Sequence, residues 1–322
     1  MVPVDAAFLL GLLVAAPAAA LLVLTSALFR SVARNRGLIP AGAVSWVEKR
    51  RAVLPAAGVL AVYVLVVSFG AFVEARWVQL TRTEIPVDRA VLGRDRLRLV
   101  HLSDLHLVDF GGRERRVVDL VREAKPHLIL LTGDYMNVRE AMDDLDRLLR
   151  LLAAEAPLGV YGIGGNMDTK FITRTIFERA GVRFLEDDTH LVPGPEGGRG
   201  LRLVGHSIRP SVPLRELLQG LKDDAFTVYL HHSPDAVDEL RDRDADQRVD
   251  LFLTGHTHGG QVCLPLWGAV VTLSKYHKKY ERGLYDARGV PMYVNRGVGT
   301  TGLPVRFLAR PEVAVIDLVV RP

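Results

Sequence analysis

The sequence predicts an α/β fold preceded by two membrane-spanning segments. Two long uncharged apolar runs lie near the N-terminus, at residues 6–29 and 52–73. From about residue 95 onward, short apolar runs alternate with segments of helical spacing, which is typical of α/β proteins. The 322 residues are 49% hydrophobic and 24% charged and include one cysteine. This composition excludes a collagen, a disordered tail and a disulfide scaffold.

The two apolar runs are long enough to cross a bilayer, whose core needs roughly 20 apolar residues in a helix. Pro17 lies in the first run, and transmembrane helices tolerate proline. The alternatives are two buried core helices of a soluble protein or, for residues 6–29, a cleaved signal peptide. Signal peptides begin with a basic region, which this run lacks. We therefore expect a membrane anchor over residues 1–85 and a catalytic domain over residues 86–322.

Basic residues gather in the link between the two runs. Against the single acid Glu48, the link carries Arg30, Arg34, Arg36, Lys49, Arg50 and Arg51. Because positively charged loops stay in the cytoplasm, we expect this link inside and the catalytic domain on the outer face of the membrane. Residues 86–322 carry 33 basic and 33 acidic side chains, so they have no net charge to attract a polyanion. This balance argues against a nucleic-acid partner and against a nuclease.

The predicted elements of the catalytic domain follow from apolar spacing. Short apolar runs between turn-forming residues predict strands at 97–103, 127–132, 159–164, 201–205, 226–230, 250–255, 292–295 and 313–320. Helical spacing, as in Leu145, Leu148, Leu149 and Leu152, predicts helices near 113–125, 139–154, 169–180, 213–221 and 235–241. The Gly- and Pro-rich residues 187–200 predict a hairpin or loop. The alternation indicates a buried sheet flanked by helices.

Residues that can bind metals follow five of the predicted strands. In such folds, ligands bind beyond the carboxyl ends of the strands. Taken singly, each set has another explanation: Gly-Asp is a common turn pair, and Asn166–Asp168 could cap a helix. The repetition at the same end of five strands instead indicates one metal site. Its candidate ligands are Asp104, His106, Asp134, Asn166, one of the adjacent His231 and His232, His256 and His258.

Five motifs in this order resemble the calcineurin-like metallophosphoesterase superfamily: DLH, GD, GNMD, HHSPD and GHTHGGQ. Further segments, YERGLY and YVNRGVGTTGLPVRF, are similar to its bacterial membrane-associated branch, which includes phosphodiesterases and UDP-2,3-diacylglucosamine pyrophosphohydrolases. The resemblance covers roughly residues 95–320. It implies a four-layer α/β/β/α sandwich, hydrolysis of a phosphodiester or pyrophosphate bond, and a place in the bacterial inner or plasma membrane.

The mixed oxygen and imidazole donors suit manganese, iron or zinc better than calcium or magnesium. Seven ligands exceed the needs of one ion, so we expect two divalent ions. The resemblance places Asp104, His106 and His258 on one ion. It places Asn166, His232 and His256 on the other, with Asp134 bridging the two ions and positioning a hydroxide that attacks phosphorus. His232 rather than His231 is the ligand, because the related pattern places it directly before x-Pro.

Met167 departs from the family pattern, since relatives usually carry a histidine directly after the asparagine ligand. That histidine is thought to protonate the leaving group, and a thioether cannot donate a proton. We therefore expect a leaving group that needs little protonation, such as one released from a pyrophosphate. The alternative is a metal-binding, catalytically idle membrane protein.

Supporting roles fall to residues near the ligands. His231 and Asp168 are candidates to orient ligands, as are Asp235 and Asn137, and Arg296 or Arg306 could contact a phosphate. Residues 261–276 include Leu264, Leu266 and Trp267 and could form an apolar lip for an acyl chain, although hairpin packing would also explain them. We expect a phosphorylated small-molecule or lipid substrate.

Overall fold

The chain forms two compact units, Met1–Val73 and Glu74–Pro322. The computed structural model describes residues 6–36, 46–196, 198–219, 224–239 and 249–321. The first unit contains α1 (Ala6–Asn35) and α2 (Trp46–Phe72). Among the described residues, one helix, Val53–Arg76, is long and apolar enough to cross a membrane. The apolar part described for the first expected span, Pro17–Arg30, is shorter. One of the two expected spans therefore has a candidate membrane helix.

The second unit is built on two six-stranded mixed sheets. The first has the order β1 (Gln79–Val87), β14 (Glu312–Val320), β2 (Arg96–Leu102), β3 (Leu128–Thr132), β4 (Val160–Ile163) and β5 (Arg183–Phe184). The second has the order β12 (Gly283–Ala287), β13 (Val290–Val294), β9 (Leu251–Thr254), β8 (Phe226–Leu230), β7 (Leu201–Gly205) and β6 (Asp188–Val192). Strands β2 to β5 are parallel to one another, and so are β13, β9, β8 and β7.

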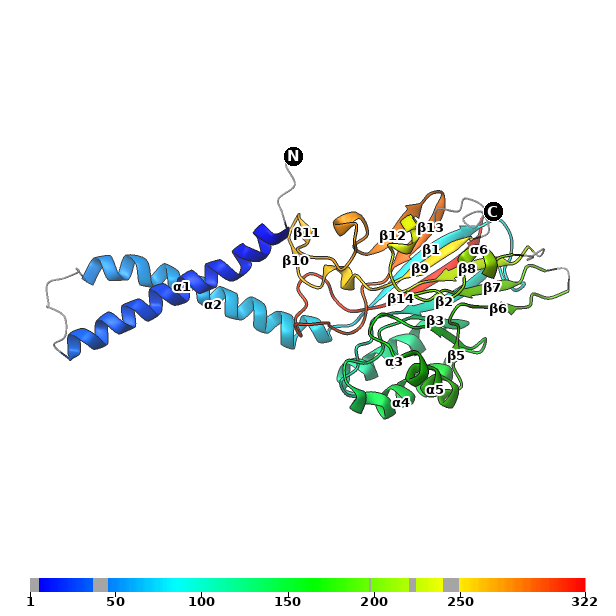
Figure 1. Cartoon of the computed structure of the whole chain (residues 1–322), viewed down its shortest axis with the longest axis horizontal. Coiled ribbons are helices and arrows are strands. Elements are labelled where there is room, and N and C mark those ends of the chain that lie inside the picture. Colours follow the sequence, from blue (N-terminus) through cyan, green and yellow to red (C-terminus); the bar gives the residue numbers. More distant parts are fainter. Residues whose placement is uncertain (1–5, 37–45, 197, 220–223, 240–248, 322) are drawn as a thin grey trace. The chain divides into compact units, whose positions relative to one another are not determined.

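Successive side chains along each strand point to opposite faces of the sheet, so they are buried in different layers. In β2, Leu97 and Leu99 join the core between the sheets, together with Val228 and Leu251 of the second sheet. Val100 of the same strand faces the opposite way, into the core under the helices. This outer layer consists of α3 (Gly112–Ala124), α4 (Met142–Ala153) and α5 (Lys170–Ala180), which lie together on one side of the domain (Figure 1).

The outer face of the second sheet carries a thinner layer. Two short helices, α6 (Leu214–Leu217) and α7 (Ala236–Glu239), contribute to a core with Tyr229 and Phe252. Short 3-10 segments complete the domain: η1 (Glu74–Arg76), η2 (Arg139–Ala141), η3 (His258–Gly260) and η4 (His277–Lys279). The α/β class is confirmed, and the layers follow the expected α/β/β/α order. The structure describes Leu214–Leu217 of the helix expected at 213–221 and Ala236–Glu239 of the helix expected at 235–241 as helical; residues 220–223 and 240–248 lie outside the described part.

Strand β1 was missing from the sequence prediction. It pairs in parallel with β14 at the edge of the first sheet, and Arg82 and Glu84 interrupt its apolar pattern. Edge strands tolerate such charges and also Pro86, because one side of the strand needs no ladder hydrogen bonds. The segment expected as a hairpin or loop at 187–200 contains β6, which pairs antiparallel with β7.

The topology brings distant segments to one place. Strands β2, β3 and β4 are parallel neighbours in the first sheet, and β8 and β9 are parallel neighbours in the second. Their carboxyl ends therefore lie at one edge of each sheet, and the two sheets share a core. The loops that leave these five strands are the loops that carry the predicted ligands.

Candidate metal centre

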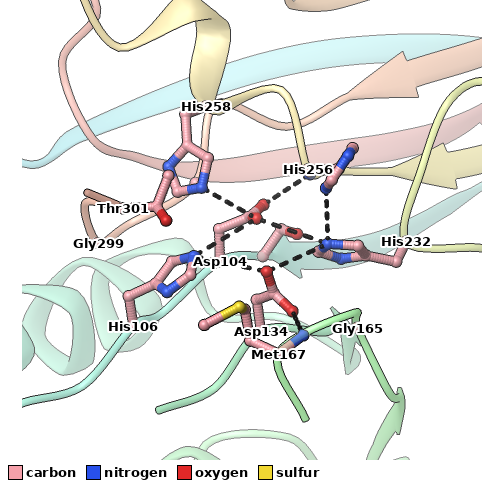
Figure 2. Close-up of polar contacts among 12 residues, drawn as sticks. Asp104, His106, Asp134, Gly165, Met167, His232, His256, His258, Gly299 and Thr301 are labelled. Atoms are coloured by element: carbon pink, nitrogen blue, oxygen red, sulfur yellow. Dashed lines mark hydrogen bonds and ion pairs between the residues drawn. The ribbon is translucent and has the colours of Figure 1, made fainter. Parts of the chain in front are cut away.

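Six of the predicted ligands form two buried groups. Asp104, His106 and His258 make the first, and Asp134, His232 and His256 make the second. Within each group, one ligand atom from every residue lies within 4.8 Å of the others. Figure 2 shows the imidazoles arranged around the two carboxylates.

The two groups share a boundary at Asp134. Its Oδ2 lies 3.4 Å from Nε2 of His232 and 3.6 Å from Nε2 of His106, which belongs to the first group. The predicted seventh ligand is also present, since Oδ1 of Asn166 lies 3.1 Å from Nε2 of His232. The fold thus brings all seven predicted residues together, although they span positions 104 to 258 of the chain.

The backbone at these positions is unusual. Asp104, His106, Asp134, His256 and His258 all have positive φ, between 43° and 69°. Side chains other than glycine seldom adopt this region, and such residues concentrate at functional sites. In an extended chain, residues i and i+2 would point the same way. His256 and His258 instead leave the extended region, and each joins a different group.

Two glycines give the ligands the room that they occupy. A Cβ atom at Gly165 would lie 2.2 Å from Oδ1 of Asp134, and one at Gly255 would lie 2.5 Å from Oδ2 of Asp104. Real side chains cannot approach so closely, so both positions require glycine. These glycines precede Asn166 and His256 directly, which explains why the motifs contain them.

Outer hydrogen bonds fix the orientation of the ligands. Nδ1 of His106 donates to Oδ1 of Asn137 at 2.6 Å, and Nδ1 of His232 donates to the carbonyl oxygen of Thr132 at 2.6 Å. Because Nδ1 holds the proton, Nε2 of each ring is the atom left to bind a metal. The role suggested for Asn137 fits this geometry. The sequence offered no signal for Thr132, because its contribution is a backbone carbonyl.

Asp168 holds the loop that carries Asp134. Its carboxylate accepts hydrogen bonds from the backbone N–H groups of Asp134, Tyr135 and Gly165, at 2.7, 2.9 and 2.8 Å. Burial, together with the nearby charge of Asp134, raises the pKa of Asp168 to about 6. The residue points at backbone rather than at either group, so its position suits an orienting role.

The electrostatics of the centre favour a bound cation. Burial alone would raise the pKa of Asp104, but the imidazoles of His258, His232 and His106 lower it below its ordinary value. Burial opposes the charged form of His232, yet its hydrogen bond and charge interaction with Asp134 raise its pKa to about 9. Without metal, a proton on His232 thus balances the buried carboxylates. A divalent cation would displace that proton.

Two buried polar atoms without hydrogen-bond partners also indicate a bound cation. Oδ1 of Asp104 and Nε2 of His106 are buried and have no hydrogen-bond partner among the described residues. A buried polar atom without a partner is costly, so unpaired atoms of this kind call for a ligand. The residues present therefore fit a pair of metal ions.

Other predicted residues lie elsewhere. The ring of His231 packs parallel to Tyr229, and its Nδ1 lies 2.8 Å from the carbonyl oxygen of Ser233. Asp235 accepts hydrogen bonds from Oγ of Ser274 and the backbone of Lys275, which anchors a loop.

The two arginines proposed for phosphate contact make internal contacts. Arg296 lies beside the buried Glu312, with 3.6 Å between Nε and Oε2. Arg306 is fully buried and donates to the carbonyl oxygens of Gly299, Ala309 and Arg296 at 2.9, 2.8 and 2.9 Å. It therefore holds the segment that follows β13 against the centre. A phosphate contact by Arg306 would require this network to open.

The sequence over residues 97–260 matches the profile of the calcineurin-like phosphoesterases. The chain belongs to this family. It is 30% identical to the uncharacterized metallophosphoesterase YkuE of Bacillus subtilis, over 78% of this chain and 88% of that protein. It is 29% identical to the phosphodiesterase YaeI of Escherichia coli, over 69% of this chain and 82% of that protein.

Two further proteins that are similar to this chain come from Danio rerio. A transmembrane protein with a metallophosphoesterase domain from Danio rerio is 30% identical, over 81% of this chain and 60% of that protein. A dimetal phosphatase from Danio rerio has a TM-score of 0.37 and 15% identity, over 63% of this chain and 88% of that chain. Membership of the family makes this chain a metal-dependent phosphoesterase with buried histidine and aspartate ligands.

His232 and His231 provide a matched pair for testing the centre. We expect His232→Asn to weaken metal binding more than about 10-fold, because changes even to outer-shell residues cost 10–100-fold. His231→Asn should keep the metal, since His231 lies outside both groups. Elemental analysis of the purified full chain, after dialysis against a metal buffer, measures both. Equal loss in the two variants would contradict the assignment.

Proposed function

We propose that this chain is a membrane-anchored phosphoesterase with a binuclear metal centre that hydrolyses a phosphodiester or pyrophosphate bond. The observation that carries the proposal is the position of Asp134, whose carboxylate lies within 3.6 Å of imidazoles from both groups. One carboxylate between two ligand sets suits a bridge between two ions. Asp104, His106 and His258 would hold the first ion, and Asn166, His232 and His256 the second.

Bound divalent ions supply Lewis-acid stabilisation of phosphoryl charge and lower the pKa of water. The donors favour manganese, iron or zinc, because imidazoles accompany the oxygens. The protein's own contribution is positioning. The backbone N–H of Met167 donates to Oδ1 of Asp134 at 2.8 Å, and Asp168 holds the backbone of Asp134. These contacts fix the carboxylate that both groups share.

A pocket of about 210 Å³ adjoins the centre, and its lining supports the proposal of an anionic leaving group. Asn166 and Asp168 line it on the side of the centre, and Lys170, Glu186 and Arg209 also contribute to its wall. Lys170 pairs with Glu186 at 3.3 Å, whereas the exposed Arg209 has no described ion-pair partner. An unpaired guanidinium can bind a phosphate through two parallel hydrogen bonds. The pocket therefore suits a leaving group that carries its own phosphate.

The side chain of Met167 supports the same substrate class. It is half exposed beside the centre and lies next to Asp134 in Figure 2. A thioether cannot protonate a leaving group, so leaving groups that depart as stable anions are favoured. Phosphate or nucleotide released from a pyrophosphate meets this requirement. A cytoplasmic UDP-sugar lipid fits this chemistry but not an external domain. Cell-wall or phospholipid diesters fit an external domain, but their hydrolysis releases an alkoxide, which needs a proton.

The leaving-group proposal is tested by Met167→His in the manganese-loaded full chain. We expect cleavage of an alkyl phosphodiester to rise by about 10²-fold or more, the low end of what a general acid contributes. Cleavage of a nitrophenyl diester should change far less, because nitrophenolate leaves without a proton. Met167→Leu is the matched control and should leave both rates unchanged.

Equal acceleration of the two substrates would contradict the leaving-group argument. A protein that binds two ions but turns over no diester, monoester or pyrophosphate with manganese, iron or zinc would favour the alternative, a catalytically idle metal-binding protein. Met167 is the observation behind that alternative. The intact set of predicted ligands argues against it, since an idle site has no need for two buried carboxylates.

We also propose that both apolar helices cross the membrane and that the catalytic domain lies outside, because the link between them is basic. Alkaline phosphatase fused after residue 322 should be active, and a fluorescent protein at the same position should be dark. The matched control is the same reporter pair fused after residue 40, in the link, where the outcome should reverse. A fluorescent fusion after residue 322 would contradict this orientation.

A further inference from the structure

A small hairpin carries the most exposed apolar side chain in the described part of the domain. Strands β10 (Cys263–Leu264) and β11 (Gly268–Ala269) pair antiparallel, and the backbone N–H of Trp267 donates to the carbonyl oxygen of Leu264. Leu266, at the tip, has a φ of 62° and a side chain that is fully exposed. Leucine is unfavourable at this φ and in water. Stability therefore does not explain leucine at this position.

We infer that this hairpin, together with the apolar and basic residues beside it, inserts into the surface of an anionic lipid bilayer. We call this set the interfacial surface; its members are Trp77, Leu266, Trp267, Lys278, Leu303, Leu308 and Arg310. The apolar side chains of Leu266, Leu303, Leu308 and Trp77 are 111%, 71%, 46% and 50% exposed, respectively. Aliphatic and aromatic side chains flanked by cations are the composition that binds at a lipid–water boundary.

Hydrogen bonds and a cation–π contact connect the hairpin to residues 74–77, where the chain enters the domain. The backbone of Cys263 donates to the carbonyl oxygen of Phe307, and the backbone of Phe307 donates to that of Gln261. Two residues further on, the backbone N–H of Ala309 donates to Oε1 of Glu74 at 2.9 Å. Arg310 then stacks on the ring of Trp77 at 3.6 Å.

This connection places the interfacial surface near the bilayer. Glu74 lies in the last turn of the one described helix that could cross a membrane, Val53–Arg76, and Trp77 follows this helix directly. Phe307 and Arg310 are three residues apart, a distance of at most about 11 Å along the chain. A bilayer that ends near Trp77 therefore lies within reach of the hairpin, whatever the angle between the two units.

Charge supports an anionic rather than a neutral membrane. The domain as a whole is neutral, but residues 261–282 carry Lys275, Lys278, Lys279 and Arg282 against Glu281. Lys278 pairs with Glu281 and Lys279 with Asp238, so an excess of two positive charges remains once Asp238 is counted. Nζ of Lys278 lies 5.2 Å from the ring centre of Trp267, which places a cation on the hairpin itself. Basic residues near a membrane surface are attracted by anionic headgroups.

The same segments reach the metal centre. His258 lies three residues before Gln261, whose Nε2 donates to the carbonyl oxygens of Thr301 and Leu303 at 3.0 and 2.9 Å. The backbone of Gly299 donates to the carbonyl oxygen of Asp104, and Gly299 and Thr301 lie beside the centre in Figure 2. Insertion of the hairpin would therefore bring the centre to phosphoesters held in the membrane. This last step rests on the proposed function, whereas the insertion does not.

Fluorescence of a probe at residue 266 tests the insertion. Cys263 is the single cysteine, so Cys263→Ala combined with Leu266→Cys gives one labelling site for an environment-sensitive nitrobenzoxadiazole probe. The labelled full chain is reconstituted into phosphatidylcholine vesicles with or without phosphatidylglycerol. We expect a blue-shifted emission that brominated acyl chains quench, with stronger quenching when phosphatidylglycerol is present. The matched control is Leu191→Cys in the same background, on β6 at the edge of the second sheet opposite β12, where neither change is expected.

The outcomes separate this inference from the proposed function. Quenching at residue 266 and not at residue 191 supports insertion, even if the chain hydrolyses no phosphoester. An unquenched probe at residue 266 overturns the inference, even if the chain is an active phosphoesterase. Equal quenching at both positions also overturns it, because contact would then not be specific to the hairpin. Metal content of both labelled variants checks that the domain remains folded.

Discussion

The domain depends on keeping two carboxylates, Asp104 and Asp134, charged inside a protein core. Burying a charge is expensive unless an opposite charge compensates it. The imidazoles around the two carboxylates supply part of that compensation, and His232 does so by holding a proton. The unpartnered atoms of Asp104 and His106 show where compensation is incomplete. Two divalent ions would complete it, and they would then stabilise the fold as well as take part in the chemistry.

The two-sheet architecture makes this arrangement possible. Parallel neighbours release their loops at the same sheet edge, so β2, β3 and β4 deliver ligands from one side, and β8 and β9 deliver them from the other. The loops then bend sharply, with positive φ at five ligand positions. Asp168 and Arg306 hold the bent segments through hydrogen bonds to backbone. Residues outside the ligand groups thus hold the backbone in a conformation that would be strained in isolation.

The sequence predicted which side chains gather at the candidate centre better than it predicted their surroundings. Asp104, Asp134 and His232 could be found because each follows an apolar strand, and strand ends converge in an α/β fold. The orienting contacts were harder to predict. Thr132 acts through its carbonyl, and Arg306 sits in a loop whose folding no local pattern indicates. Strand β1 was missed because an edge strand with charges lacks the apolar alternation that marks its neighbours. Residue patterns reveal local structure, whereas these features depend on tertiary packing.

The most direct test of the account is whether two ions share one centre. Electron paramagnetic resonance of the full chain loaded with manganese measures this without reference to any substrate. We predict the spectrum of an exchange-coupled manganese pair, because Asp134 lies between the two ligand groups. Asp134→Asn should weaken that coupling or lose one ion. A spectrum of isolated, uncoupled manganese in the unsubstituted protein would contradict the binuclear centre.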